Sequence, residues 1–256
     1  GNDEIKKFYQ TGTILQNNLN ISAGGADGYV NLNLGNVRRD FILEGDELNR
    51  NTVVLTAGKK INKFTVGGTF TFTNQRTKQA NVNAATSRSD YTLLTTLLQA
   101  ASNVPIEEFK NRGLYGWNGY YQNPYWAREN NRLEETKNFI NLGMNAGYEI
   151  NKNIEIVYNG SVQMRNTNQV SYSNQAISPA DADGGFDSPS QFYQSTLGST
   201  FYYGDLMANF NYDLSDALKL KFNVGQNVQY NYSKRISQGG TNLEIPGLYN
   251  IANVLN

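Results

Sequence analysis

The segment Lys63-Phe64-Thr65-Val66-Gly67-Gly68-Thr69-Phe70-Thr71-Phe72-Thr73-Asn74-Gln75 alternates apolar and polar residues along its length. Its even positions are phenylalanine or valine except for Gly68 and Asn74, and its odd positions are mostly threonine. Because a β-strand points successive side chains to opposite faces, this pattern predicts a strand with one apolar and one polar face. Segments 139–150, 153–165 and 217–232 alternate in the same way.

These alternating segments are long for a soluble sheet, whose strands usually have about 5–6 residues. A tilted strand that crosses a bilayer needs about 9–11 residues, and such segments separated by turn residues are typical of transmembrane β-barrels. No apolar run is long enough for a transmembrane helix. The mean hydropathy is low, at -0.56, which is compatible with a barrel because alternation and polar loops dilute its apolar wall. The sequence therefore predicts an all-β protein, a transmembrane antiparallel β-barrel.

Composition excludes several classes of function. Lys+Arg and Asp+Glu are both 22, so the chain lacks the basic field of a nucleic-acid-binding protein. It contains neither cysteine nor histidine, which removes thiolate metal sites, cysteine nucleophiles and the Ser-His-Asp triad. Enzymatic sequence motifs are also absent, and we expect neither catalysis nor a cofactor. The 17 tyrosines are typical of the aromatic girdles of outer-membrane barrels.

The full pattern predicts eight strands joined alternately by short turns and long connections. The long connections are 39–49, 77–135, 168–198 and the tail from 233. In outer-membrane barrels the short turns face the periplasm and the long loops face outside, so 77–135 and 168–198 are expected to be large extracellular loops. The predicted strands are 8–22, 28–38, 50–59, 63–76, 136–150, 153–167, 199–213 and 217–232.

Several stretches resemble the SusC family of TonB-dependent outer-membrane transporters of Bacteroidota. The short motifs that carry the resemblance keep the family's order and spacing, so the resemblance extends over nearly all of residues 1–256. They are Phe8-Tyr9-Gln10-Thr11-Gly12 with Asn18–Gly25, Leu48–Thr52 with the following turn and strand, Asn123-Pro124-Tyr125-Trp126, Asn138–Gly143, and Ile245–Asn253.

This resemblance implies that residues 1–256 form part of one transmembrane barrel domain, about eight strands of a 22-stranded barrel. The family's signal peptide, TonB box and plug domain are not visible in the sequence, and we expect an internal piece of a longer chain. The implied function is active import of a bulky nutrient, an oligosaccharide or a peptide, across the bacterial outer membrane. The implied partners are a SusD-like surface lipoprotein that covers the barrel, the TonB complex acting through parts outside this chain, and outer-membrane lipid.

Aromatic residues are concentrated in 114–126, inside the predicted loop 77–135. Tyrosine and tryptophan faces beside asparagine and glutamine are suited to docking a sugar ring, a peptide or a partner protein. The alternative is that the rings form a small core that holds the long loop against the barrel. We expect the Asn-Pro-Tyr-Trp end to be the more structural part. The candidate substrate- or lid-contacting residues are Tyr115, Trp117, Tyr120, Tyr121, Tyr125 and Trp126.

Two further features lie in the predicted loops. Asp181, Asp183 and Asp187 form an acidic, glycine-rich segment that is a weak candidate for a Ca²⁺ site, since it lacks the complete ligand pattern of an EF-hand; a solvated acidic loop is the favoured interpretation. Leu93 to Leu98 predict a short helix that ends before Pro105 and packs on the loop aromatics.

Two other architectures fit the alternation. A complete eight-stranded barrel, acting as an adhesin or a structural anchor, would pair 8–22 with 217–232. A soluble, glycan-binding β-sandwich would bury its apolar faces against each other in a dry core.

Overall fold

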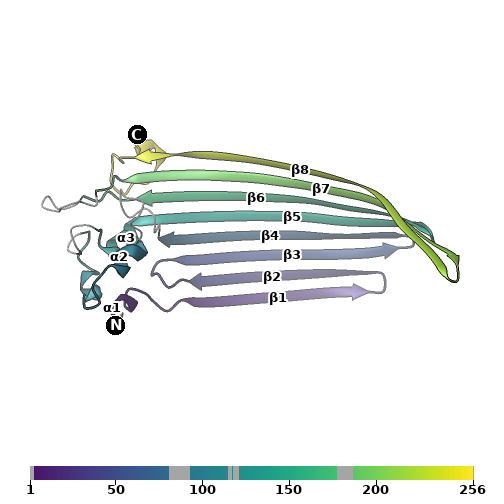
Figure 1. Cartoon of the computed structure of the whole chain (residues 1–256), viewed down its shortest axis with the longest axis horizontal. Helices are drawn as coiled ribbons and strands as arrows, with labels where there is room; N and C mark the ends of the chain where they lie inside the picture. The colour runs from purple at the N-terminus through teal and green to yellow at the C-terminus, as the bar shows by residue number, and fades with distance from the viewer. Residues whose placement is uncertain (1–2, 81–92, 115–116, 118–120, 178–186, 256) are drawn as a thin grey trace.

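The computed structural model describes residues 3–80, 93–114, 117, 121–177 and 187–255. Its strands form one eight-stranded antiparallel sheet, in which every strand pairs with its neighbours in chain order, from β1 to β8. Figure 1 shows long strands lying side by side, with the helices gathered at one end of the sheet and the tight turns at the other. The predicted all-β class and the eight strands are confirmed.

The strands are much longer than the helices. The strands are β1 (Thr13–Gly25), β2 (Gly28–Asp40), β3 (Glu47–Ile61), β4 (Phe64–Ala80), β5 (Asn131–Asn151), β6 (Ile154–Ser173), β7 (Gln191–Ser215) and β8 (Leu218–Thr241). The helical segments are α1 (Asp3–Lys6), α2 (Leu93–Leu98), η1 (Ile106–Phe109), α3 (Pro124–Asn130) and η2 (Ile251–Asn253). The predicted helix over Leu93–Leu98 is confirmed.

Local chemistry explains the tight turns. Asn62, between β3 and β4, has a φ of 54°, in the left-handed region that asparagine tolerates better than most residues. Between β5 and β6, the side-chain oxygen of Asn151 accepts hydrogen bonds from the backbone N–H groups of Asn153 (2.9 Å) and Ile154 (3.1 Å). Asparagine thus closes both hairpins, as the sequence predicted.

The strand ends at the loop end of the sheet correct the sequence prediction. The predicted loop 77–135 shrinks to 81–130 and the predicted loop 168–198 to 174–190, because β4, β5, β6 and β7 all extend into them. The strand β8 likewise continues to Thr241, whereas β1 begins only at Thr13 and leaves Phe8 in the loops. Beyond the apolar region both faces of the sheet carry mostly polar side chains, with isolated apolar ones such as Leu133 and Ile236. The period-two signal therefore fades, although the backbone ladder continues.

Register divides the sheet into two faces, which we name the apolar face and the polar face. Antiparallel partners lie on the same face, so the register fixes each residue's face across all strands. One transverse row of the apolar face carries an aliphatic or aromatic side chain on every strand. This row is Ile21, Leu32, Leu55, Phe70, Leu142, Val162, Tyr202 and Tyr230. The neighbouring row on the polar face reads Ser22, Asn31, Thr56, Thr69, Gly143, Ser161, Tyr203 and Gln229.

A row of asparagines bounds the apolar face toward the loop end. Six strands contribute one asparagine each at directly paired positions. The row consists of Asn17, Asn36, Asn51, Asn74, Asn138 and Asn166. Amide groups within it hydrogen-bond across strands at 2.7 Å, from Asn36 to Asn51 and from Asn74 to Asn138. This asparagine row marks where the apolar face ends.

The edges of the sheet distinguish the alternative architectures. The strands β1 and β8 are the two outer strands, and among the described residues they do not pair with each other, so the pairing that a closed eight-stranded barrel requires is not formed. A sandwich is not formed either, because the described strands belong to one sheet and its apolar side chains are exposed, including Leu142 at 47% and Phe222 at 46%. None of the helices in the described residues has the length and apolar character needed to cross a bilayer.

Candidate functional site

The loops at one end of the sheet enclose a small apolar core. Phe8, Leu97, Ile106 and Tyr125 come from four separate segments and are each at most 3% exposed. The Phe8 and Tyr125 rings meet edge to face, with centroids 4.9 Å apart. Residues distant in sequence therefore hold the loops together at the loop end of β4 and β5. We call this cluster of buried side chains the loop core.

Asn123 connects this loop core to the helix α3. Its side-chain oxygen accepts a hydrogen bond from the Tyr125 N–H (3.0 Å), which caps the helix before Pro124. Its amide nitrogen donates to the carbonyl oxygens of Phe109 (2.7 Å) and Gly113 (2.8 Å). Asn123 itself is 0% exposed; its bond to the Tyr125 N–H is buried, and its bonds to the two carbonyls are partly buried. This one side chain therefore connects three backbone segments.

Replacing Asn123 by alanine is expected to destabilise the loop core by about 1–2 kcal/mol, because the helix loses its cap and two partly buried hydrogen bonds to the carbonyls of Phe109 and Gly113 are lost. Hydrogen exchange of the amides in 106–130 of the full-length protein would measure this loss. The matched control is Asn111→Ala at an exposed position, which should leave exchange unchanged. Equal exchange in both variants would contradict the structural role of Asn123.

A charged network lies beside the loop core. Arg128 is 2% exposed and pairs with Glu44 (3.0 Å) and Glu129 (3.3 Å), while its guanidinium lies over the rings of Phe8 and Tyr125. The charge of Arg128 holds the pKa of the Glu44 carboxyl below its ordinary value. The Nε and Nη1 atoms of Arg128 are buried without a hydrogen-bond partner. The faces of the Phe8 and Tyr125 rings therefore compensate part of the buried charge.

Asp46 anchors the second half of this network. Its carboxylate accepts hydrogen bonds from the Ala80 N–H (2.7 Å) and from Arg132 (3.0 Å). Burial raises the pKa of Asp46, and these two donors oppose that effect. Arg132 also donates to the carbonyl of Gly45 at 2.6 Å, so the loop between β2 and β3 is fastened to the start of β5.

The predicted aromatic site residues have different surroundings in the structure. Tyr125 lies inside the loop core, and Trp126 packs partly buried against it. Trp117 meets Phe109 edge to face at 5.1 Å, with its Nε1 buried and unpaired. The hydroxyl of Tyr121 donates to Gln99. Tyr115 and Tyr120 lie outside the described residues.

The Ca²⁺ candidate is described only at one position. Asp187 is exposed at the end of the loop between β6 and β7, whereas Asp181 and Asp183 lie outside the described residues. In the described part of the chain, no group of three or more acidic or histidine side chains is placed to hold a metal ion.

The polar face offers a second surface, which sequence reasoning did not single out as a site. Amide and hydroxyl groups line it across all strands, and some of them hydrogen-bond to one another, such as Asn20 to Asn31 at 3.0 Å and Thr56 with Thr69 at 3.4 Å. Cationic side chains join them near the loop end, including Arg50 and Arg235 in one transverse row. Such a surface can bind polar, extended molecules.

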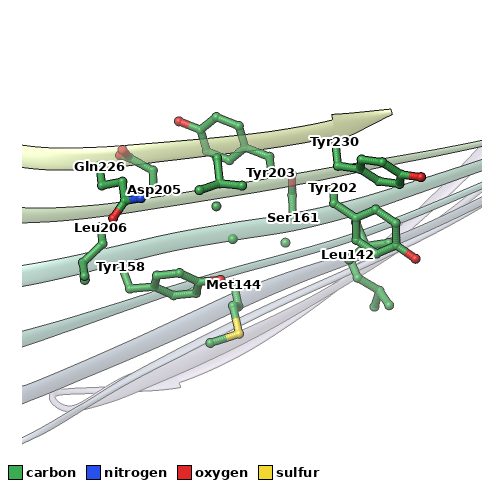
Figure 2. A pocket seen from close by; sticks show the side chains of 15 residues that line it. Leu142, Met144, Tyr158, Ser161, Tyr202, Tyr203, Asp205, Leu206, Gln226 and Tyr230 are labelled. Atoms are coloured by element: carbon green, nitrogen blue, oxygen red, sulfur yellow. The ribbon is translucent and has the colours of Figure 1, made fainter. Parts of the chain in front are cut away.

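A hollow of 690 Å³ lies between β5 and β8 (Figure 2). Gly160 and Gly204 pair directly across β6 and β7 and leave space on the apolar face. Tyr158, Leu206 and Tyr230 surround this space, and the Tyr158 hydroxyl leans over Gly160. Because its lining is mainly apolar, this hollow belongs to the surface of the apolar face and carries no convergent polar groups for chemistry.

Comparisons with known proteins identify solved structures of similar fold. No family model matches the chain, and no curated protein matches it. Among solved structures, the RagAB peptide importer in its 'closed-closed' and 'open-open' states matches with a TM-score of 0.75 and 13% identity, over 99% of this chain. A third structure, of the RagAB peptide transporter, matches with the same TM-score and 14% identity. This chain spans 28% of the length of those chains, and at such identity the likeness shows the fold alone.

Proposed function

We propose that this chain forms part of the wall of a transmembrane β-barrel, in a SusC-type importer of bulky nutrients in the bacterial outer membrane. The observation that carries the proposal is the two-faced sheet. Its apolar face is continuous over all eight strands and exposed. An exposed apolar surface of this extent needs a covering of lipid or protein, and lipid fits a sheet whose opposite face is polar.

The height of the apolar face agrees with a bilayer. From Ile140 to Tyr148 the β5 positions on this face are apolar, which corresponds to about 27 Å along the strand. At a tilt of about 40° this becomes roughly 21 Å, close to the apolar band of about 25 Å on outer-membrane barrels. The asparagine row then lies at the membrane surface, where amide groups can contact water and lipid headgroups.

The unpaired edges support a larger barrel. The strands β1 and β8 end the sheet in the described residues, and open strand edges do not persist inside a bilayer, because their backbone groups need partners. The missing partners would be other strands of the same barrel, in keeping with the 28% coverage of the matched chains and with a barrel of about 22 strands. A barrel of that size needs a plug to prevent leakage.

Import is the activity we assign to this barrel, with a peptide as the first candidate for the nutrient and an oligosaccharide as the second. The peptide is favoured because the structures of like fold are those of a peptide importer. The end of the sheet with the loop core would face outside, toward a SusD-like lipoprotein lid. The TonB complex would supply energy through parts of the protein beyond this chain.

The test uses the full-length protein in its own bacterium. Deleting its gene should abolish uptake of a fluorescent oligopeptide library, re-expression should restore it, and a protonophore should stop it. The protein should fractionate with the outer membrane and copurify with a lipoprotein. Unchanged uptake in the deletion strain, with oligosaccharide uptake also unchanged, would reject import. Recovery of the protein in the soluble fraction would reject the barrel.

A further inference from the structure

Cationic side chains form an arc on the polar face, near its loop end. Arg50, Lys137 and Arg235 occupy a single transverse row, connected through directly paired residues of β4, β6 and β7. Arg165 on β6 lies one step below this row, and Arg39 on β2 lies one step above it. We call this set the cationic arc.

Within the described residues, the arginines of the cationic arc are not paired with acidic side chains. In the described part of the chain, Arg39, Arg50, Arg165 and Arg235 form no ion pair, and all four are exposed. Arg39 lies over the ring of Phe41 at 4.6 Å, and Arg165 lies 5.5 Å from the centre of the Phe139 ring. The stacked rings hold these two guanidinium groups at the surface without neutralising them.

The unpaired positive charge on the polar face lies at one level along the strands. At the level of the cationic arc, the acidic side chain on the described polar face is Glu135, and it pairs with Lys137 at 2.6 Å. At the short-turn end of the same face, acids and bases are mixed, and Lys60 pairs with Glu149 at 2.9 Å. The positive charge is therefore concentrated at the level of the asparagine row, which in the proposed barrel is the outer mouth of the lumen.

We infer that the cationic arc binds the carboxylate side chains of acidic peptides at the mouth of the lumen. This inference rests on the proposed function, because it requires the polar face to line the lumen of a peptide importer. Guanidinium groups match carboxylates in charge and in planar geometry, and a basic mouth concentrates anionic substrates before they enter.

The dimensions of the arc fit an oligomer. Neighbouring strands lie about 4.8 Å apart, so the arc extends about 29 Å from β2 to β8. An extended peptide advances about 3.4 Å per residue, so roughly nine residues would span it. Amide and hydroxyl side chains between the cations, among them Gln75 and Thr167, can hydrogen-bond to the peptide backbone.

The test compares two peptides and two variants of the full-length protein. A nine-residue peptide with alternating glutamates is matched by the same peptide with glutamines, and binding is measured on the purified protein with its lipoprotein. The variant Arg39→Gln/Arg50→Gln/Arg165→Gln/Arg235→Gln removes the four unpaired charges of the arc and leaves Lys137, which pairs with Glu135. The control Arg38→Gln/Arg76→Gln removes exposed arginines from the apolar side of neighbouring strands.

We expect the acidic peptide to bind about tenfold more tightly than its neutral match, and the arc variant to lose this preference. The control should keep it, and rising salt should weaken only the binding of the acidic peptide. Equal binding of both peptides by the unmodified protein would overturn the inference and leave peptide import standing. A preference retained by the arc variant would also overturn the inference. Binding of an oligouronide in place of the acidic peptide would overturn it as well. Failure to bind or take up any peptide would instead reject the proposed function.

Discussion

Replacing Met144 by lysine should prevent most of the full-length protein from folding into the outer membrane. Met144 lies midway between Ile140 and Tyr148 on the apolar face, and it is 52% exposed. In the proposed barrel this position is the bilayer midplane, where a lysine costs about 2–4 kcal/mol. At that depth the ammonium group is farthest from both aqueous phases, so its long side chain gives the least relief.

The matched control is Asn145→Lys, one residue along the same strand. Asn145 is also exposed, but it belongs to the polar face, paired with Gly67 and Asn159. A lysine there enters a water-filled lumen and should change stability by less than about 0.5 kcal/mol. The folded fraction is measured by heat modifiability on gels and by urea titration in lipid vesicles. If both variants fold equally well, the apolar face does not face lipid.

Replacing Leu97 by alanine should loosen the whole loop core, with a loss of about 2–5 kcal/mol in local stability. Leu97 is 0% exposed on α2 and packs with Phe8, Ile106 and Tyr125. The cavity left by the shorter side chain would lie among buried side chains that several loop segments contribute. The effect should therefore extend from α2 to α1 and α3.

The neighbouring residue provides the control for this substitution. Leu98 belongs to the same helix but is 64% exposed, so Leu98→Ala should change local stability by less than about 0.5 kcal/mol. Amide hydrogen exchange at 93–98 and 124–130 would distinguish the two variants, and the strands should remain protected in both. Similar exchange in Leu97→Ala and Leu98→Ala would show that the loops do not share a core.

Much of the fold follows from the sequence because alternation is a local property. The segment 63–75 shows which side chains share a face before any partner strand is known, and Asn62 and Asn151 mark the turns by their own backbone chemistry. A short apolar run that ends before Pro105 predicts the helix Leu93–Leu98 in the same local way. Strand length was underestimated where both faces are polar, as in the end of β6 near Ser173, because hydrogen-bond pairing there leaves no periodic signal.

The loops show why a candidate site is harder to predict. The aromatic residues of 114–126 were visible in sequence, but whether a ring is buried depends on segments far away in the chain. Phe8 reaches Tyr125 only after four strands have been traversed, and Asp46 meets Arg132 across a separation of 86 residues. The sequence offered no periodicity or motif that would place these pairs together.

The sequence by itself determined the two-faced strands, their number and the alternation of short and long connections. Only the tertiary structure decided which residues of different strands lie side by side in the sheet. Asn36 and Asn138 were isolated asparagines in sequence, and register placed them in one row. Arg50 and Arg235 were likewise brought to the same level by pairings through every intervening strand. The physical reason is that side-chain period depends on the local backbone, whereas register depends on backbone hydrogen bonds between distant segments.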